Sequence, residues 1–281
     1  MKPDNRARYA DRVDRVLAHI EAAEAPEALV LDQLAGIAAL SPFHFHRVFR
    51  LMTGETLADT LRRVRVARTL PELADDRASI TQAAGTAGYA SSQAYARAVR
   101  ATTGGTASQL RRDPALIERL LKPARPDSTA MPVEIVSTDP LRLLAIRNVG
   151  AYEELNATYE ALFGQVFDTA PMEALRGIWG VWHDDPRFTQ AAQLEFDCAI
   201  DVGDLPAPDG IIVLNVAGGR HARLRHVGDY DSLHDSIDRL YARMIEAGED
   251  FADRPLVVNY VDDPESRPAA EWRSDIYLPL A

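Results

Sequence analysis

The chain has 281 residues, with 31 Lys and Arg against 42 Asp and Glu, which gives a formal net charge of −11 at pH 7. This length exceeds one typical domain, and the acidic total would by itself argue against nucleic acid as a partner. The single cysteine, Cys198, excludes an intramolecular disulfide and supplies no zinc site.

The charge is distributed unevenly along the chain. Residues 1–125 contain 19 Lys and Arg against 14 Asp and Glu, whereas residues 126–281 contain 12 against 28. This asymmetry assigns any contact with nucleic acid to the first half. A polar start at residues 1–4 and the absence of a long apolar run predict a cytoplasmic protein without a membrane partner.

The segment from residue 31 to residue 54 has the pattern of a helix, a tight turn and a second helix. Ser41 before Pro42 marks the start of the second helix, with the serine as N-cap. Apolar residues at helical spacing form one buried stripe in the first helix: Leu31, Leu34, Ala35 and Ala38. The side chains left for base edges and phosphates on the second helix are Phe43, His46, Arg47 and Arg50.

The same pattern recurs at residues 80–104. Ile80, Ala83 and Ala84 precede a turn at Gly88, and the exposed candidates after it are Ser92, Gln93, Ala94 and Arg97. One such unit matches many buried helix pairs by chance. Two in tandem can place two helices in successive major grooves of double-stranded DNA, so they favour DNA binding.

The first 110 residues resemble the AraC/XylS class of bacterial transcription regulators. The resemblance rests on the S-P-x-x-F-x-R-x-F helix that begins at Ser41 and ends in T-G, and on Ile80, Ala83 and the Gly88-Tyr89 turn of the second unit. It implies a tandem helix-turn-helix domain, with double-stranded DNA and RNA polymerase as partners. Departures from the family pattern are Ala39 in place of a turn glycine, Pro71 at the end of the connecting helix, Val99 and Ala107.

A proline-rich stretch without hydrophobic periodicity, K-P-A-R-P-D-S-T-A-M-P, follows this region. It predicts an all-α domain over residues 1–121, a linker over 122–131 and a second domain over 132–281. The second domain contains a repeat, because the segment from Arg142 aligns without gaps on the segment from Arg220. In each copy a strand ends at V-G and an amphipathic helix follows.

Further strands are expected at residues 133–136, 177–183, 193–200, 211–216, 256–260 and 272–278. The predicted fold is α+β, with an antiparallel sheet of two pseudo-twofold halves and both helices on one face. The opposite, concave side of the sheet is then the expected ligand cleft.

Residues 132–281 resemble the GyrI-like, or SHS2-type, effector-binding domain. The resemblance rests on the paired V-G-x-Y-x-x-L segments, on G-V-W-H-D-D-P from Gly180 and on W-R-S-D-I-Y-L-P-L from Trp272. It implies a cleft for amphipathic, often cationic molecules, with aromatic walls and an acidic residue on the last strand. Asp275 occupies that position, where the family often has glutamate, and Glu195 stands near a usual arginine.

The three tryptophans, Trp179, Trp182 and Trp272, all fall on expected strands of this domain. Strand alternation places Trp179 and Trp182 on opposite faces, so at most one of them can line the cleft. Tryptophan faces can hold a cation, although a strand tryptophan is more often part of the core. The predicted ligand-binding residues are Trp182, Trp272, Asp275, Tyr277 and Glu195.

No metal site, cofactor or catalytic residue is predicted, because H-D-D-P at residues 183–186 is typical of a turn. The sequence therefore predicts a ligand-responsive, DNA-binding transcription regulator that is not an enzyme. Two alternatives remain open. The second domain could hydrolyse small molecules with Asp275 and Tyr277 in an acid-base role, or it could serve only as a dimerisation or protein-binding module.

Overall fold

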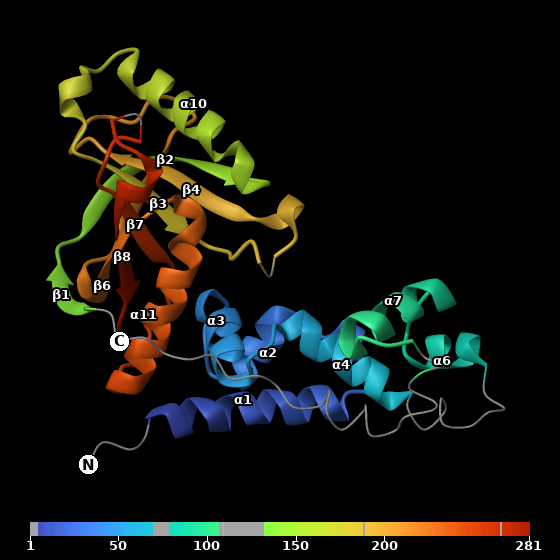
Figure 1. Ribbon diagram of the computed structural model, residues 1–281. Helices are drawn as coiled ribbons and strands as arrows, with labels where there is room; N and C mark the ends of the chain where they lie inside the picture. The colour runs from blue at the N-terminus through green and yellow to red at the C-terminus, as the bar shows by residue number, and fades with distance from the viewer. Residues whose placement is uncertain (1–4, 70–78, 107–108, 110–131, 188, 265) are drawn as a thin grey trace. The chain divides into compact units, whose positions relative to one another are not determined.

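The computed structural model describes residues 5–69, 79–106, 109, 132–187, 189–264 and 266–281 (Figure 1). The chain divides into two compact units, Ala7–Asp127 and Ser128–Ala281 together with Met1–Arg6. Pro71, Ala107 and the expected linker at 122–131 lie outside the described residues, so the expected domain boundaries stay predictions. Among the described helices, none combines the length and the apolar composition that a membrane crossing requires.

The described part of the first unit is helical, as the sequence predicts. Both helix-turn-helix pairs are present, α2 with α3 and α6 with α7, and α4 connects them. The elements are α1 (Asn5–Ala22), η1 (Pro26–Ala28), α2 (Leu31–Ile37), α3 (Pro42–Thr53), α4 (Leu57–Arg68), α6 (Ile80–Thr86) and α7 (Ser92–Thr103).

Capping residues explain where these helices begin and end. Ser79 forms a capping box with Gln82 at the start of α6, and the Ser91 hydroxyl accepts from the Ala94 amide at the start of α7. Ser41 is the N-cap of α3 and Pro42 its first residue, as predicted, although the Ser41 side chain accepts no capping bond. Gly54 ends α3 in the left-handed region at a φ of 79°.

The second helix-turn-helix packs on α4 through a small apolar core. Ala83 and Ala84 are buried as expected, whereas Ile80 is 38% exposed. The Tyr95 hydroxyl lies 2.6 Å from the Thr69 hydroxyl in a buried hydrogen bond. The core consists of Val66, Ala83, Ala84, Ala87, Tyr95, Ala98 and Val99. Helix α4 therefore supports α7 directly.

The second unit is an α+β fold with eight antiparallel strands and two long helices (Figure 1). The strands are β1 (Glu134–Thr138), β2 (Leu141–Val149), β3 (Gly177–Trp182), β4 (Glu195–Asp201), β5 (Ile212–Val216), β6 (Gly219–Val227), β7 (Leu256–Tyr260) and β8 (Arg273–Pro279). The helical elements are η2 (Tyr152–Glu154), α10 (Leu155–Phe167), η3 (Met172–Ala174), η4 (Ala191–Gln193), η5 (Tyr230–Ser232), α11 (Leu233–Ala247) and η6 (Ala269–Glu271).

The repeat covers the whole unit, beyond the two segments whose sequences align from Arg142 and Arg220. Strands β1 to β4 recur as β5 to β8, and the strand order β1-β6-β8-β7-β3-β4-β2-β5 is symmetric about the contact between β7 and β3. The first strand of each half is exchanged, because β1 pairs with β6 and β5 pairs with β2. The predicted fold class and pseudo-twofold sheet are thus confirmed.

Both helices cover one face of the sheet. Leu162 and Val166 of α10 pack on Leu144 and Ile200, and the Ser236 hydroxyl of α11 bonds to His226 at 2.9 Å. Directly paired residues share a face. One row of such pairs crosses the sheet on the helix-covered face, through strands β4, β3, β7, β8 and β6. Its residues are, in that order, Ile200, Ile178, Tyr260, Ser274 and His226.

Candidate ligand pocket and recognition helices

A cavity of about 640 Å³ lies on the sheet face that the two helices cover. Its walls come from the starts of α10 and α11, the short helices η2 and η5 that precede them, and strands β3 and β7. Most of the large side chains are aromatic: Tyr152, Tyr159, Phe163, Trp182, Phe196, Tyr230 and Tyr260. This volume and this lining are those of a site for a drug-sized molecule.

The two walls of the cavity are copies of each other. Tyr152 contacts the Trp182 ring edge-on, with ring centroids 5.6 Å apart, and Tyr230 contacts Tyr260 in the same way at 5.0 Å. The two pairs occupy equivalent positions of the repeat, at the offset that relates Arg142 to Arg220. The cavity therefore lies across the pseudo-twofold relation.

A short motif repeats in the lining of the cavity. Asp184 follows the first wall and Asp262 the second, each within a D-D-P sequence whose proline lines the cavity. The Asp184 carboxylate accepts from the Glu195 amide at 2.8 Å, and the Asp262 carboxylate accepts from the Arg273 amide at 2.9 Å. The paired D-D-P motif was the sequence signal that could have located both walls.

The charged groups of the lining are acidic. Glu153 and Asp231 are exposed at equivalent rim positions, and no lining residue that the structure describes is Lys or Arg. Asp262 is buried but is held by Arg273, with a 2.7 Å contact from Nη2 to Oδ1. This guanidinium lowers the pKa of Asp262 to about 2, so its charge is already matched.

Three tyrosine hydroxyls of the cavity, those of Tyr159, Tyr230 and Tyr260, stay protonated near neutral pH. Burial raises the pKa of Tyr159 and of Tyr260 well above the usual value, and that of Tyr230 to about 12. The Tyr159 hydroxyl donates to the Trp179 carbonyl at 2.7 Å, and the Tyr152 hydroxyl donates to the Asp184 carbonyl at 3.1 Å. The cavity thus presents neutral aromatic walls with an acidic rim.

The structure brings only part of the predicted ligand-binding set to this cavity. Trp182 lines it. Trp272 supports the wall from behind, with its ring centroid 4.7 Å from that of Tyr230. Asp275, Tyr277 and Glu195 do not line it, and their assignment as ligand-binding residues stays a prediction.

Strand register explains why these three residues lie away from the cavity. Ser274 pairs with Tyr260 and therefore shares the helix-covered face, so Asp275 points to the opposite face. Tyr277 lies two residues further along the same strand, and Glu195 precedes Phe196 of the cavity wall. The cavity itself is on the helix side of the sheet, not on the opposite side where the ligand cleft was expected.

The opposite face carries paired ions instead. Arg225 contacts Asp275 through Nε–Oδ1 and through Nη2–Oδ2 at 2.7 Å, and Arg147 contacts Asp197 in the same way at 2.7 and 3.0 Å. A smaller cavity of about 220 Å³ on this face is lined by Arg147, His183, Asp197, His221 and Arg254 among others. Its carboxylate is already bound by Arg147 and by His183.

The predicted DNA-binding residues differ in exposure. Gln93 and Arg97 of α7 are exposed, whereas Ser92 and Ala94 are partly buried. On α3, Phe43, His46 and Arg50 are partly exposed. Arg47 is only 3% exposed, which contradicts the expectation that it lies on the outside.

Helical geometry accounts for Arg47. It lies three residues after His44, and both belong to a buried side of α3 that also contains Phe45, Val48 and Phe49. This buried side is wider than the apolar residues alone indicate. The exposed strip of α3 is correspondingly narrow and contains Phe43, His46 and Arg50.

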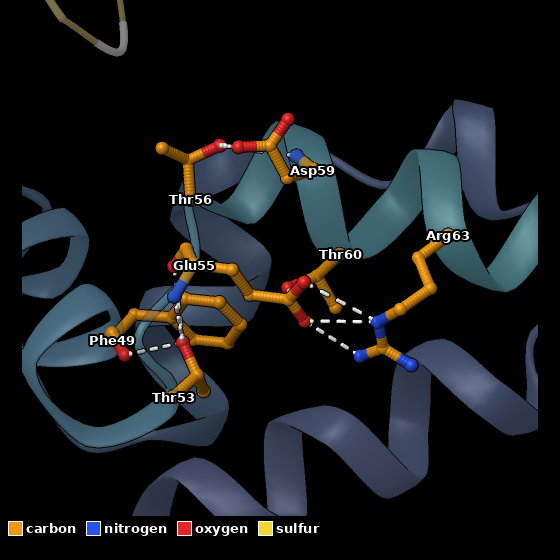
Figure 2. Close-up of polar contacts among 7 residues, drawn as sticks. All are labelled: Phe49, Thr53, Glu55, Thr56, Asp59, Thr60 and Arg63. Carbon is orange, nitrogen blue, oxygen red and sulfur yellow. Dashed lines mark hydrogen bonds and ion pairs between the residues drawn. The ribbon is translucent and has the colours of Figure 1, made fainter. Parts of the chain in front are cut away.

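A polar cluster joins α3 to α4 (Figure 2). The Glu55 carboxylate accepts from Arg63 Nη2 at 2.6 Å and from the Thr60 hydroxyl at 2.9 Å. The Thr53 hydroxyl donates to the Phe49 carbonyl at 2.9 Å and closes the end of α3. Figure 2 shows Arg63 reaching from α4 to Glu55, two residues after the end of α3, so the end of the first recognition helix is fixed to the connecting helix.

Comparison with known proteins identifies two regions of the chain. Residues 131–281 match the family described as the GyrI-like small molecule binding domain, and residues 34–113 match a helix-turn-helix domain. The chain is 31% identical over 107 residues to the probable transcriptional regulator YgiV of Escherichia coli K12, an alignment that covers 37% of this chain and 66% of YgiV.

The regulatory protein ada of Salmonella typhimurium is 35% identical over 111 residues, covering 40% of this chain and 31% of ada. The chain thus spans less than two thirds of the length of these relatives. A cryo-EM structure of an EcmrR–DNA complex has a TM-score of 0.47 at 14% identity and covers 89% of this chain and 98% of the other.

Proposed function

Because the chain belongs to the GyrI-like small-molecule-binding family and also carries an AraC-type helix-turn-helix domain, we propose that it is a transcription regulator whose DNA binding responds to a small-molecule effector. The observation that carries this proposal is the 640 Å³ aromatic cavity in the GyrI-like domain. The proposed partners are double-stranded DNA, the effector and, for a protein that acts at promoters in the cytoplasm, RNA polymerase.

The proposed effector is an amphipathic molecule that can carry a positive charge. The faces of Tyr152, Trp182, Tyr230 and Tyr260 offer cation–π and stacking contacts. The exposed carboxylates of Glu153 and Asp231 favour a cation over an anion, and the described lining contains no Lys or Arg to attract an anion. We assign effector binding to these residues in place of Asp275, Tyr277 and Glu195.

The proposed DNA-contacting surface consists of the exposed strips of α3 and α7. On α7 these are Gln93 and Arg97, with Ser92 and Ala94 beside them; on α3 they are Phe43, His46 and Arg50. Arg47 drops out of the base-contacting set because its side chain is buried.

The hydrolase alternative loses its structural support. Acid-base catalysis by a carboxylate requires a raised pKa in a closed cleft. Asp275 lies outside the cavity and is bound to Arg225, and the buried carboxylate in the cavity, Asp262, has a lowered pKa. We therefore propose an effector-binding role without catalysis.

A single titration series tests the proposed function. A DNA duplex is first selected from a random pool with the full-length protein, and its affinity is then measured with and without tetraphenylphosphonium and the neutral triphenylphosphine oxide. Saturable binding of the cation, coupled to a change in DNA affinity of about 5- to 150-fold, is expected. Ligand binding without any change in DNA affinity would favour a storage or dimerisation role for the second domain.

A further inference from the structure

Arg65 joins the connecting helix α4 to the turn of the second helix-turn-helix. Its Nε donates to the Ala87 carbonyl at 2.8 Å and its Nη2 donates to the Gly88 carbonyl at 2.9 Å. Its guanidinium carbon also lies 4.0 Å from the centre of the Tyr89 ring. Three consecutive residues of the turn are therefore held by one side chain, which is only 18% exposed.

The turn is also enclosed from a second side. Gly88 has a φ of +70°, and a Cβ at this position would lie 2.9 Å from Oε1 of Glu27 in η1. Oε2 of Glu27 lies 3.9 Å from Arg65 Nε. The turn thus has little room to move between Arg65 and Glu27.

Arg63 performs the corresponding task for the first unit. It lies two residues before Arg65, so the two side chains leave α4 on nearly opposite sides. Arg63 binds Glu55 beside the end of α3, as Figure 2 shows, while Arg65 binds the turn before α7. Two arginines of α4 therefore bind the segments next to the recognition helices, one at the end of α3 and one at the turn before α7.

The position of the turn determines the position of α7. Tyr89 contacts Tyr95 of α7, with ring centroids 5.7 Å apart, and the Tyr95 hydroxyl bonds to Thr69 just beyond the end of α4. The Thr69 contact fixes one point of α7, and the Arg65 contacts fix the turn that leads into it. Without the second attachment, α7 can pivot about the first.

We propose that Arg65 is a positioning residue for the second recognition helix, and that contact of α7 with DNA depends on it. This inference rests on the proposed DNA-binding function. Arg65 acts through the turn, because its donors are directed at two backbone carbonyls and its plane lies against Tyr89. A lysine cannot replace it, since an ammonium group lacks the planar fork that makes both bonds while stacking on a ring.

The test compares Arg65→Lys with Arg62→Lys in the full-length protein. Both substitutions keep the charge. Arg62 lies on the same helix and pairs with the exposed Asp59 at 2.6 Å. With a duplex selected by the wild type, Arg65→Lys should lose footprint protection at the half-site bound by the second unit and keep protection at the first. Affinity should fall about tenfold or more, the typical cost of losing base contacts. Arg62→Lys should match the wild type.

Two further measurements separate positioning from direct contact. Tyr89→Leu removes the stacking without changing charge, and it should lose the same half-site. If Arg65 contacted a phosphate instead, Arg65→Ala would reduce by about one the slope of log binding constant against log salt concentration. Tyr89→Leu would then leave DNA binding unchanged. Protection of both half-sites in Arg65→Lys and Tyr89→Leu would overturn the proposal.

Hydrogen exchange provides a readout that needs no DNA. Amide exchange at residues 87–89 and in the first turn of α7 should rise in Arg65→Lys and not in Arg62→Lys. If the wild type selects no DNA sequence, the proposed function fails, and the exchange data still decide whether Arg65 holds the turn. Unchanged exchange in Arg65→Lys would refute that role.

Discussion

Arg225 binds Asp275 with two nitrogens on the sheet face opposite the aromatic cavity, and Arg147 binds Asp197 in the equivalent place of the other half. Each pair links residues that are 50 positions apart. The acidic residue of the last strand is therefore a structural member of a repeated ion pair, and it is directed away from the proposed effector.

Asp275→Asn should consequently leave effector selectivity unchanged. The carboxylate is 7% exposed and its partner 44% exposed, so we expect a loss of about 1 kcal/mol in unfolding free energy. Calorimetric titration with a cationic and a neutral ligand should give wild-type affinities for both. The matched control is Glu134→Gln, which removes the exposed partner of Arg223 and should change neither quantity. A lower affinity of Asp275→Asn for the cationic ligand alone would instead support the prediction that Asp275 binds the effector.

The rim carboxylates should provide the charge selectivity of the cavity. Glu153→Gln and Asp231→Asn keep side-chain volume and remove charge, so each should weaken a cationic ligand by up to about fivefold, as expected for solvent-exposed charges. Neutral analogues should be unaffected. Trp182→Leu should weaken both ligand types, since it removes wall area. Equal losses for cation and neutral analogue in the rim variants would exclude a charge role.

Stability in acid should depend on Asp262. Its pKa is depressed to about 2 by Arg273, so its stabilising contribution is complete above the unfolded-chain pKa of about 3.9 and is lost as the pH falls toward 2. Urea unfolding of the wild type between pH 2 and 5 should show stability rising with pH. Asp262→Asn should flatten the curve in this window. Parallel curves for the two proteins would show that other carboxylates dominate.

The two turn positions of the helix-turn-helix units should respond in opposite directions. Ala39 has a φ of 50°, which is unfavourable for a residue with a Cβ, and Ala39→Gly should stabilise the protein by about 0.5–1 kcal/mol. Gly88→Ala should destabilise it, because the new Cβ would approach Glu27. Thermal unfolding of both variants checks this, and Ala39→Gly with a lowered Tm would contradict it.

Arg97 and Arg47 occupy equivalent positions of the two recognition helices but should behave differently. Arg97→Ala should weaken DNA binding by about 1–3 kcal/mol without lowering the Tm, because its side chain is exposed. Arg47→Ala should lower the Tm, because it removes a buried side chain. Mobility shifts at fixed salt and thermal unfolding separate the two effects. Normal DNA binding by Arg97→Ala would remove α7 from the proposed interface.

The sequence was sufficient for the fold because local signals agree with the long-range pattern. Ser79 and Ser91 mark helix starts, Gly54 marks a helix end, and the internal repeat predicts the pseudo-twofold sheet. The side of the sheet that holds the cavity was not predictable in this way. Alternation separates Ser274 from Asp275, but only the packing of α10 and α11 decides which face the helices cover.

The residues of the candidate site were predictable from the sequence to different degrees. Trp182 was identified by its type and position, whereas Tyr152, Tyr230 and Tyr260 were missed, although the repeat contains them at equivalent positions. The burial of Arg47 could not be derived from its charge, because the buried side of α3 extends past its apolar residues.

The exchange of the first strands makes each half of the domain incomplete without the other. Half of the GyrI-like domain alone would present one edge without its neighbour, since β1 completes the sheet of the other half and β5 returns the exchange. Two separate copies could satisfy each other only as an intertwined homodimer, with identical walls around its axis. Fusion into one polypeptide frees the walls to diverge. Trp182 corresponds to Tyr260 and Asn156 to His234 in the repeat, and all four line the cavity, so the chain can accommodate an asymmetric molecule where a symmetric homodimer would bind every ligand in two equivalent orientations.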